Sequence, residues 1–240
     1  MYDPTVARLT YRALLGRHRA LMLSALPALL LVIAIAVRAL DVADDQTAIQ
    51  LLGGFGLATM VPLIGVIAGT GAIGPEIDDG SIVYLLSKPV KRPTIIVTKL
   101  IVAIGVTIVF SAVPLLVAGY ILVGGSQQIA VAYAIAAVIG SIAYSAVFLL
   151  LGTVTRHAVV FGLVYALLWE TLFGSLVEGA RMLSVQQWAL AVAEKVAGSG
   201  ADITSEVGLT TAAVLLTVVT VAGTWYAGQR LKVLTLTGDE

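Results

Sequence analysis

Residues 74–92 read GPEIDDGSIVYLLSKPVKR, a charged passage that separates two long and almost uninterrupted apolar runs. Three acidic residues come first in this passage and three basic residues follow them. Pro75 is tolerated in the first turn of a helix, acidic side chains stabilise a helix N-terminus, and Lys88 stabilises the C-terminus before Pro89 ends the helix. The passage therefore predicts a short helix over residues 75–88 between two apolar segments.

The composition of the whole chain indicates where these apolar segments lie. Hydrophobic residues make up 59% of the sequence, charged residues only 12%, and the mean hydropathy is +1.02. Soluble domains carry roughly a quarter charged residues, so the chain is predicted to be an integral membrane protein. The formal net charge of zero gives no basic surface for nucleic acid, and the absence of cysteine excludes disulfides and thiolate metal sites.

Six apolar runs have about the 20 residues that are needed to cross a bilayer. The runs are continuous and do not alternate with a period of two, which favours helices over a β-barrel. We therefore predict an all-α, polytopic protein with a single transmembrane domain over residues 1–240, and we expect the first run to be retained because it starts too late for a signal peptide. The predicted spans are residues 21–40, 51–73, 100–123, 129–151, 159–178 and 208–228.

Basic residues predict the orientation of these spans. One side of the membrane carries only Arg38, Arg181 and Lys195. The positive-inside rule therefore places both termini and the 75–88 helix in the cytoplasm. The cytoplasmic set is Arg8, Arg12, Arg17, Arg19, Lys88, Lys91, Arg92, Lys99, Arg156, Arg230 and Lys232.

Two amphipathic segments flank the spans. Residues 1–20 begin with Asp3 as a predicted N-cap and continue at helical spacing, which predicts a helix on the inner membrane surface. Residues 179–207 form an outer segment, in which Ser184 and Gln187 make a capping box that predicts a short interfacial helix. We expect both helices to anchor the protein at membrane lipids.

The predicted helix over residues 75–88 carries its own apolar stripe of Ile82, Leu85 and Leu86, and Gly80 is expected to bend it. A loop helix needs no such stripe unless something covers it. Spacing alone does not decide whether the membrane surface or a groove on a cytoplasmic partner covers this stripe.

The same segment resembles the coupling region of type 2 ABC exporter permeases. Topology supports the resemblance, because those permeases also have six spans, cytoplasmic termini, a surface helix before the first span and an extended outer segment between the fifth and sixth. Lys99 follows at the start of the next span. The residues that carry the motif are Gly74, Glu76, Gly80, Leu85, Leu86, Pro89 and Arg92.

The resemblance implies a non-enzymatic permease subunit of an exporter with a hydrophobic substrate, in the plasma membrane and specifically a bacterial inner membrane. No G-x-x-x-x-G-K-[ST] motif occurs in the chain, so ATP and Mg²⁺ are expected on a separate ABC ATPase. A second copy or a related permease is expected to complete the assembly. The residues implied in ATPase coupling are Glu76, Asp78, Asp79, Gly80, Ile82, Leu85, Leu86, Pro89 and Arg92.

Glu170 is predicted to lie near the middle of the fifth span, where an ionisable group is costly and is a functional candidate. Two interpretations stay open. Glu170 is either a structural carboxyl, protonated or hydrogen-bonded between helices, or a site for a substrate or a proton. Three threonines of the sixth span provide the expected hydrogen-bonding face, namely Thr217, Thr220 and Thr224.

Other classes of function leave specific traces in a sequence. Gly65 and Gly69 form a G-x-x-x-G motif, which favours packing within the chain over a dimer contact. His18 and His157 have no second ligand nearby, so no metal site is predicted. The aspartate array of membrane phospholipid synthases is missing, and no predicted span contains the His that an intramembrane protease would pair with a Ser. A proton-coupled secondary transporter using Glu170 and a structural subunit of a membrane complex remain as alternatives.

Overall fold

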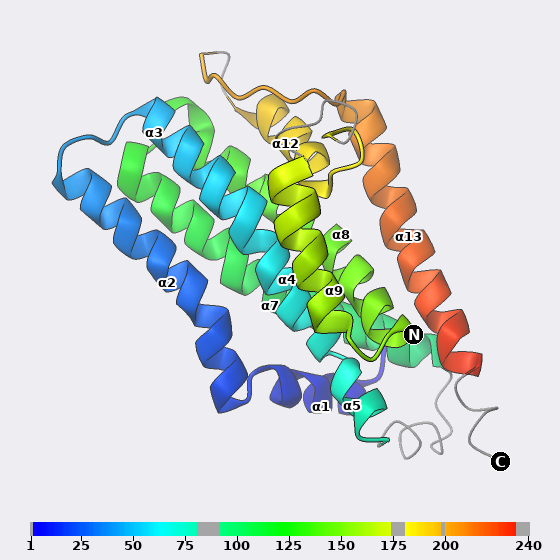
Figure 1. Cartoon of the computed structure of the whole chain (residues 1–240). Helices are drawn as coiled ribbons and strands as arrows, with labels where there is room; N and C mark the ends of the chain where they lie inside the picture. The colour runs from blue at the N-terminus through cyan, green and yellow to red at the C-terminus, as the bar shows by residue number, and fades with distance from the viewer. Residues whose placement is uncertain (1, 81–91, 174–180, 198–199, 234–240) are drawn as a thin grey trace.

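The computed structural model describes residues 2–80, 92–173, 181–197 and 200–233, and it contains no strand within those ranges. The chain forms a bundle of long helices with shorter helices at both ends (Figure 1). In chain order these are α1 (Pro4–Leu14), α2 (Arg17–Ala39), α3 (Asp45–Gln50), the π-helix η1 (Leu51–Met60), α4 (Val61–Gly71), α5 (Gly74–Asp78), α7 (Arg92–Val123), the 3₁₀ turn η2 (Ser126–Gln128), α8 (Ile129–Val154), α9 (Ala158–Val164), the π-helix η3 (Tyr165–Phe173), α12 (Val185–Val196) and α13 (Leu209–Val233).

Five helical stretches of the described chain are long and apolar enough to cross a membrane. They confirm a multi-pass, all-helical protein and correspond to the first, second, third, fourth and sixth predicted spans. The fifth predicted span is represented by a shorter apolar helix, Ala158–Glu170, and residues 174–178 of that prediction lie outside the described residues. The five long stretches are His18–Ala39, Asp45–Ile77, Arg92–Val123, Ile129–Val154 and Leu209–Leu231.

Helix α8 lies at the centre of the bundle, where it packs against α4, α7, α12 and α13. Hydroxyl pairs join α8 to α7: Thr107 Oγ1 lies 3.2 Å from Ser145 Oγ, and Ser111 Oγ lies 3.0 Å from Ser141 Oγ. Such short polar side chains allow close helix contact and hydrogen-bond across it. Helices α2 and α13 lie at opposite edges and keep most of their apolar side chains exposed (Figure 1).

The G-x-x-x-G motif packs within the chain, as the sequence predicts. A Cβ atom at Gly65 would lie 2.9 Å from Tyr144 Cβ of α8, and one at Gly69 would lie 2.7 Å from Phe148 Cβ. Both distances are shorter than normal contacts, so α4 approaches α8 this closely only because these positions are glycine.

Both flanking amphipathic helices are present. Helix α1 begins after Asp3, whose carboxylate accepts hydrogen bonds from the backbone N–H groups of Thr5 and Val6 at 2.8 and 3.0 Å. Helix α12 begins after Ser184, whose hydroxyl accepts from the backbone N–H of Gln187 at 3.4 Å. The capping residues chosen from the sequence therefore start these helices.

Candidate functional site

The described part of the predicted coupling helix is α5, which starts directly after the C-terminal end of α4. Pro75 occupies its first turn and Glu76 follows at a position where an acidic side chain stabilises a helix. The helix ends at Asp78, and Gly80 has a φ of +68°, a left-handed conformation that glycine adopts without strain. Gly80 therefore follows the end of α5, and residues 81–88 of the predicted helix lie outside the described residues.

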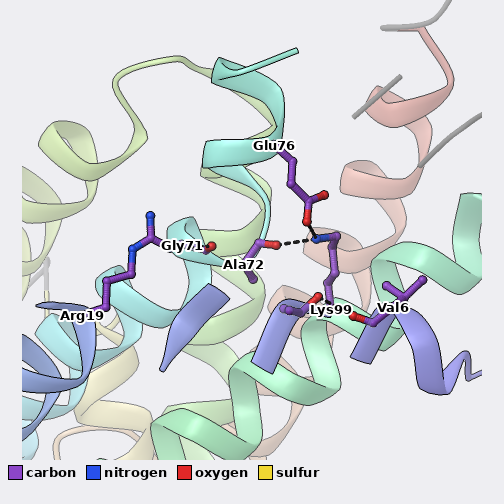
Figure 2. Close-up of polar contacts among 7 residues, drawn as sticks. Val6, Arg19, Gly71, Ala72, Glu76 and Lys99 are labelled. Atoms are coloured by element: carbon purple, nitrogen blue, oxygen red, sulfur yellow. Dashed lines mark hydrogen bonds and ion pairs between the residues drawn. The ribbon is translucent and has the colours of Figure 1, made fainter. Parts of the chain in front are cut away.

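Lys99 of α7 connects α5 to the bundle. Its side chain is completely buried, and its ammonium donates to Glu76 Oε1 at 2.6 Å and to the carbonyl oxygen of Ala72 at 2.7 Å (Figure 2). Ala72 is the residue after α4, so this carbonyl is one that the helix itself leaves without a partner. A cation at a helix C-terminus also interacts favourably with the helix dipole.

Two further helices contact the same corner of the molecule. Arg19 of α2 donates to the carbonyl oxygen of Gly71 at 3.2 Å, next to the carbonyl that Lys99 binds (Figure 2). The backbone N–H of Asp3, at the start of α1, donates to Thr98 Oγ1 at 3.1 Å. We call the set Arg19, Gly71, Ala72, Glu76 and Lys99 the junction. It joins α2, α4, α5 and α7 through polar contacts.

The candidate coupling residues divide into four groups. Glu76 lies in the junction, while Asp79 and Gly80 are exposed at the end of α5. Arg92 is the first residue of α7 and is half-buried. Ile82, Leu85, Leu86 and Pro89, together with the side chain of Asp78, lie outside the described residues.

The partners of Glu170 differ from those that the sequence indicated. Its carboxylate binds Tyr165 and the start of α12, as described below. Thr217 and Thr224 donate to carbonyl oxygens of their own helix, α13, so the expected Glu170–threonine contact is not formed among the described residues.

Thr220 and Thr224 instead line a groove of about 440 Å³ between α13 and the N-terminal part of α7. The wall contributed by α7 consists of Pro93, Ile96 and Val97. The groove is therefore mainly apolar, with hydroxyl groups along one side.

Sequence reasoning did not assign Lys99 and Arg19 to the junction. Lys99 is one of the predicted cytoplasmic cations and follows the motif of the resemblance, but it also begins an apolar run and is the kind of charged residue that requires a buried partner. The need for a buried partner is the feature of the sequence that could have identified Lys99 as a site residue. Within the described part of the chain, no three His, Cys, Asp or Glu side chains lie close enough to hold a metal ion.

The model of a family described as "ABC-2 family transporter protein" matches residues 13–226, which is nearly the whole chain. A search of curated proteins found no match.

Proposed function

Because the chain belongs to the ABC-2 transporter family and is therefore a multi-pass membrane component of an ABC transporter, we propose that it is the permease subunit of an exporter driven by a separate ABC ATPase. ATP and Mg²⁺ bind to that partner, since the sequence contains no phosphate-binding loop. A second permease, either the same chain or a related one, completes the membrane path. The complex resides in the plasma membrane, specifically a bacterial inner membrane. The chain crosses this membrane six times, and both of its termini lie in the cytoplasm.

The observation that carries this proposal is the junction. A coupling segment must be bound firmly to the bundle, because a loosely attached loop would absorb the movement of the ATPase. Glu76 and Lys99 provide that attachment through contacts of 2.6 and 2.7 Å around a fully buried ammonium. The contacts are charge-assisted and therefore strong.

The mechanism follows from the helices that meet at the junction. Closure of the ATPases around ATP displaces the segment that begins with α5. Lys99 passes this displacement to α7, and the Ala72 and Gly71 carbonyls pass it to α4 and, through Arg19, to α2. Tilting of these helices opens the path toward the outside. The apolar, hydroxyl-lined groove between α7 and α13 supports a hydrophobic substrate.

Purification of the tagged chain from its native membranes tests the proposal. We expect a protein with a phosphate-binding loop to co-purify and to be identified by mass spectrometry. Leu85→Asp is expected to reduce its recovery about tenfold or more, since a buried carboxylate in an apolar groove costs several kcal/mol.

Val42→Asp is the matched control, because Val42 is an exposed aliphatic residue in the loop between α2 and α3, on the opposite side of the bundle from α5. This variant should retain the partner at the wild-type level. Recovery of the same partner with Leu85→Asp would contradict docking through the 75–88 segment, and a complex without an ATP-binding protein would contradict the proposed function as a whole.

A further inference from the structure

Glu170 is almost completely buried, with an exposure of 1%, and both oxygens of its carboxylate are used. Oε1 accepts hydrogen bonds from the Tyr165 hydroxyl at 2.8 Å and from the backbone N–H of Val185 at 3.1 Å. Oε2 accepts from the Ser184 hydroxyl and from the backbone N–H of Gln186 at 3.3 Å. A side chain of η3 therefore caps the first turn of α12, which is a different part of the chain.

These contacts suit the ionised carboxylate. Each oxygen faces one backbone N–H, which can only donate, so both oxygens act as acceptors, and an ionised carboxylate accepts such hydrogen bonds more strongly than a neutral carboxyl does. The N-terminus of a helix also carries partial positive charge, which stabilises an anion there. The Ser184 hydroxyl completes the cap by accepting from the N–H of Gln187. The backbone N–H groups of Val185, Gln186 and Gln187, which have no partner within the helix, are thus all satisfied.

Helix α12 is held deep within the bundle. Gly140 is the twelfth residue of the 26-residue helix α8, and a Cβ atom at that position would lie 3.6 Å from Cβ of Ala189. Trp188 is 4% exposed and Ala189 is fully buried. The middle of α12 therefore packs against the middle of α8.

Helix α12 has two further attachments, and both come from Ser205. The Ser205 backbone N–H donates to Glu194 Oε2 at 2.9 Å, and the Ser205 hydroxyl donates to the Gln187 carbonyl oxygen at 3.1 Å. Glu170 binds the backbone N–H groups of the first turn of α12, and it is the attachment that comes from the apolar helix Ala158–Glu170. A movement of η3 would move this end of α12 with it.

We propose that Glu170 is a positioning residue whose ionised carboxylate holds α12 against α8, and that it does not carry a transported proton or cation. This role goes beyond the proposed transport function and rests only on contacts within the chain. It also distinguishes the two interpretations that the sequence leaves open, because a carrier must release its bound group, whereas a cap must keep its charge.

Two cysteine pairs measure the position of α12 directly, since the chain has no cysteine of its own. Gly140→Cys/Ala189→Cys joins α8 to α12 with a Cβ separation of 3.6 Å, and Ala146→Cys/Gly223→Cys joins α8 to α13 with a separation of 3.8 Å. Both separations suit a disulfide. The second pair is the control, because the described partners of Glu170 lie in η3 and at the start of α12 and not in α13. The measurement is the rate of disulfide formation in membranes with copper phenanthroline, followed by mass spectrometry of peptides.

Glu170→Gln is expected to slow formation of the α8–α12 disulfide about tenfold, because an amide offers one acceptor oxygen and turns an N–H₂ group toward a backbone donor. The α8–α13 disulfide should form at the wild-type rate. Loss of both disulfides would indicate general unfolding and would contradict a local role.

A second substitution at the cap tests the charge itself. Ser184→Asp places a carboxylate at the N-cap position, where aspartate is strongly favoured. In the Glu170→Gln background it should restore the α8–α12 disulfide, since the new carboxylate replaces the lost charge. In the wild-type background the same substitution should slow the disulfide, because two carboxylates then face each other. If Glu170 were a carrier, Ser184→Asp would not be expected to speed the α8–α12 disulfide in one background and slow it in the other.

The outcomes separate the possibilities. An α8–α12 disulfide that forms at the wild-type rate in Glu170→Gln would overturn the proposal, and so would a failure of Ser184→Asp to restore it. If Glu170→Gln accumulates poorly, the amount of folded protein becomes the measured quantity, and the same rescue is required. None of these readouts involves ATP or transport, so a failure here is distinguishable from a failure of the proposed function.

Discussion

Replacing Glu76 with leucine is expected to lower the free energy of unfolding by about 4 kcal/mol, because it leaves the buried Lys99 ammonium with only the Ala72 carbonyl. Lys99→Met should cost less, about 3 kcal/mol, since the Glu76 carboxylate is 28% exposed and water can solvate part of it. Thermal unfolding of the purified protein in detergent measures both values. The asymmetry follows from the difference in burial of the two partners.

The double variant Glu76→Leu/Lys99→Met provides the control. Apolar side chains of similar size leave no unpaired charge, so the double variant should be more stable than either single variant. If the losses of stability in the two single variants simply add in the double variant, the two charges do not interact. That result would contradict the Glu76–Lys99 ion pair of the junction.

Replacing Gly69 with valine is expected to destabilise the bundle by about 2 kcal/mol or more. An added Cβ would lie 2.7 Å from Phe148 Cβ and 3.1 Å from the backbone nitrogen of Leu149, so α4 and α8 must separate. The same thermal unfolding assay measures the loss. The position lies two residues before Gly71 and three before Ala72, so the substitution should also disturb the junction.

Gly105→Val is the matched control for this packing prediction. Gly105 lies in α7, and a Cβ atom there would have no neighbour within 4 Å. Its substitution should change stability by less than about 0.5 kcal/mol. If both glycine variants were equally stable, the close contact between α4 and α8 would be contradicted.

Composition and local patterns predicted much of the fold, because membrane helices follow from continuous apolar runs and helix starts follow from capping residues. The run at 129–151 became α8 at Ile129–Val154, and Asp3 and Ser184 became N-caps. The fifth span is the least well predicted from the sequence. Its apolar helix is short, and at Tyr165 the α-helix changes to a π-helix. No periodic pattern in the sequence indicates that change.

The polar contacts of both candidate sites depend on tertiary structure. Lys99 and Glu76 are 23 positions apart, with the charged passage between them, so their pairing requires α5 and α7 to meet. Glu170 was assigned to threonines because their spacing matched one face of the sixth span. Instead, α12 folds back into the bundle and its first turn supplies stronger donors than a threonine, which bonds to its own helix. Sequence spacing on two helices does not reveal a third helix between them.

The central claim is that movement of a separate ATPase enters the membrane bundle through the junction. Spin labels at Gln46→Cys and Asp202→Cys, which are exposed positions in α3 and in the segment between α12 and α13, test it in the complex purified with its ATPase. We expect the distance between the labels to change when ATP and vanadate trap the ATPase. With Lys99→Met the partner should still bind and hydrolyse ATP, while the distance stays that of the ATP-free complex. An unchanged distance in the wild-type complex during ATP hydrolysis, or the same change with Lys99→Met, would contradict the account.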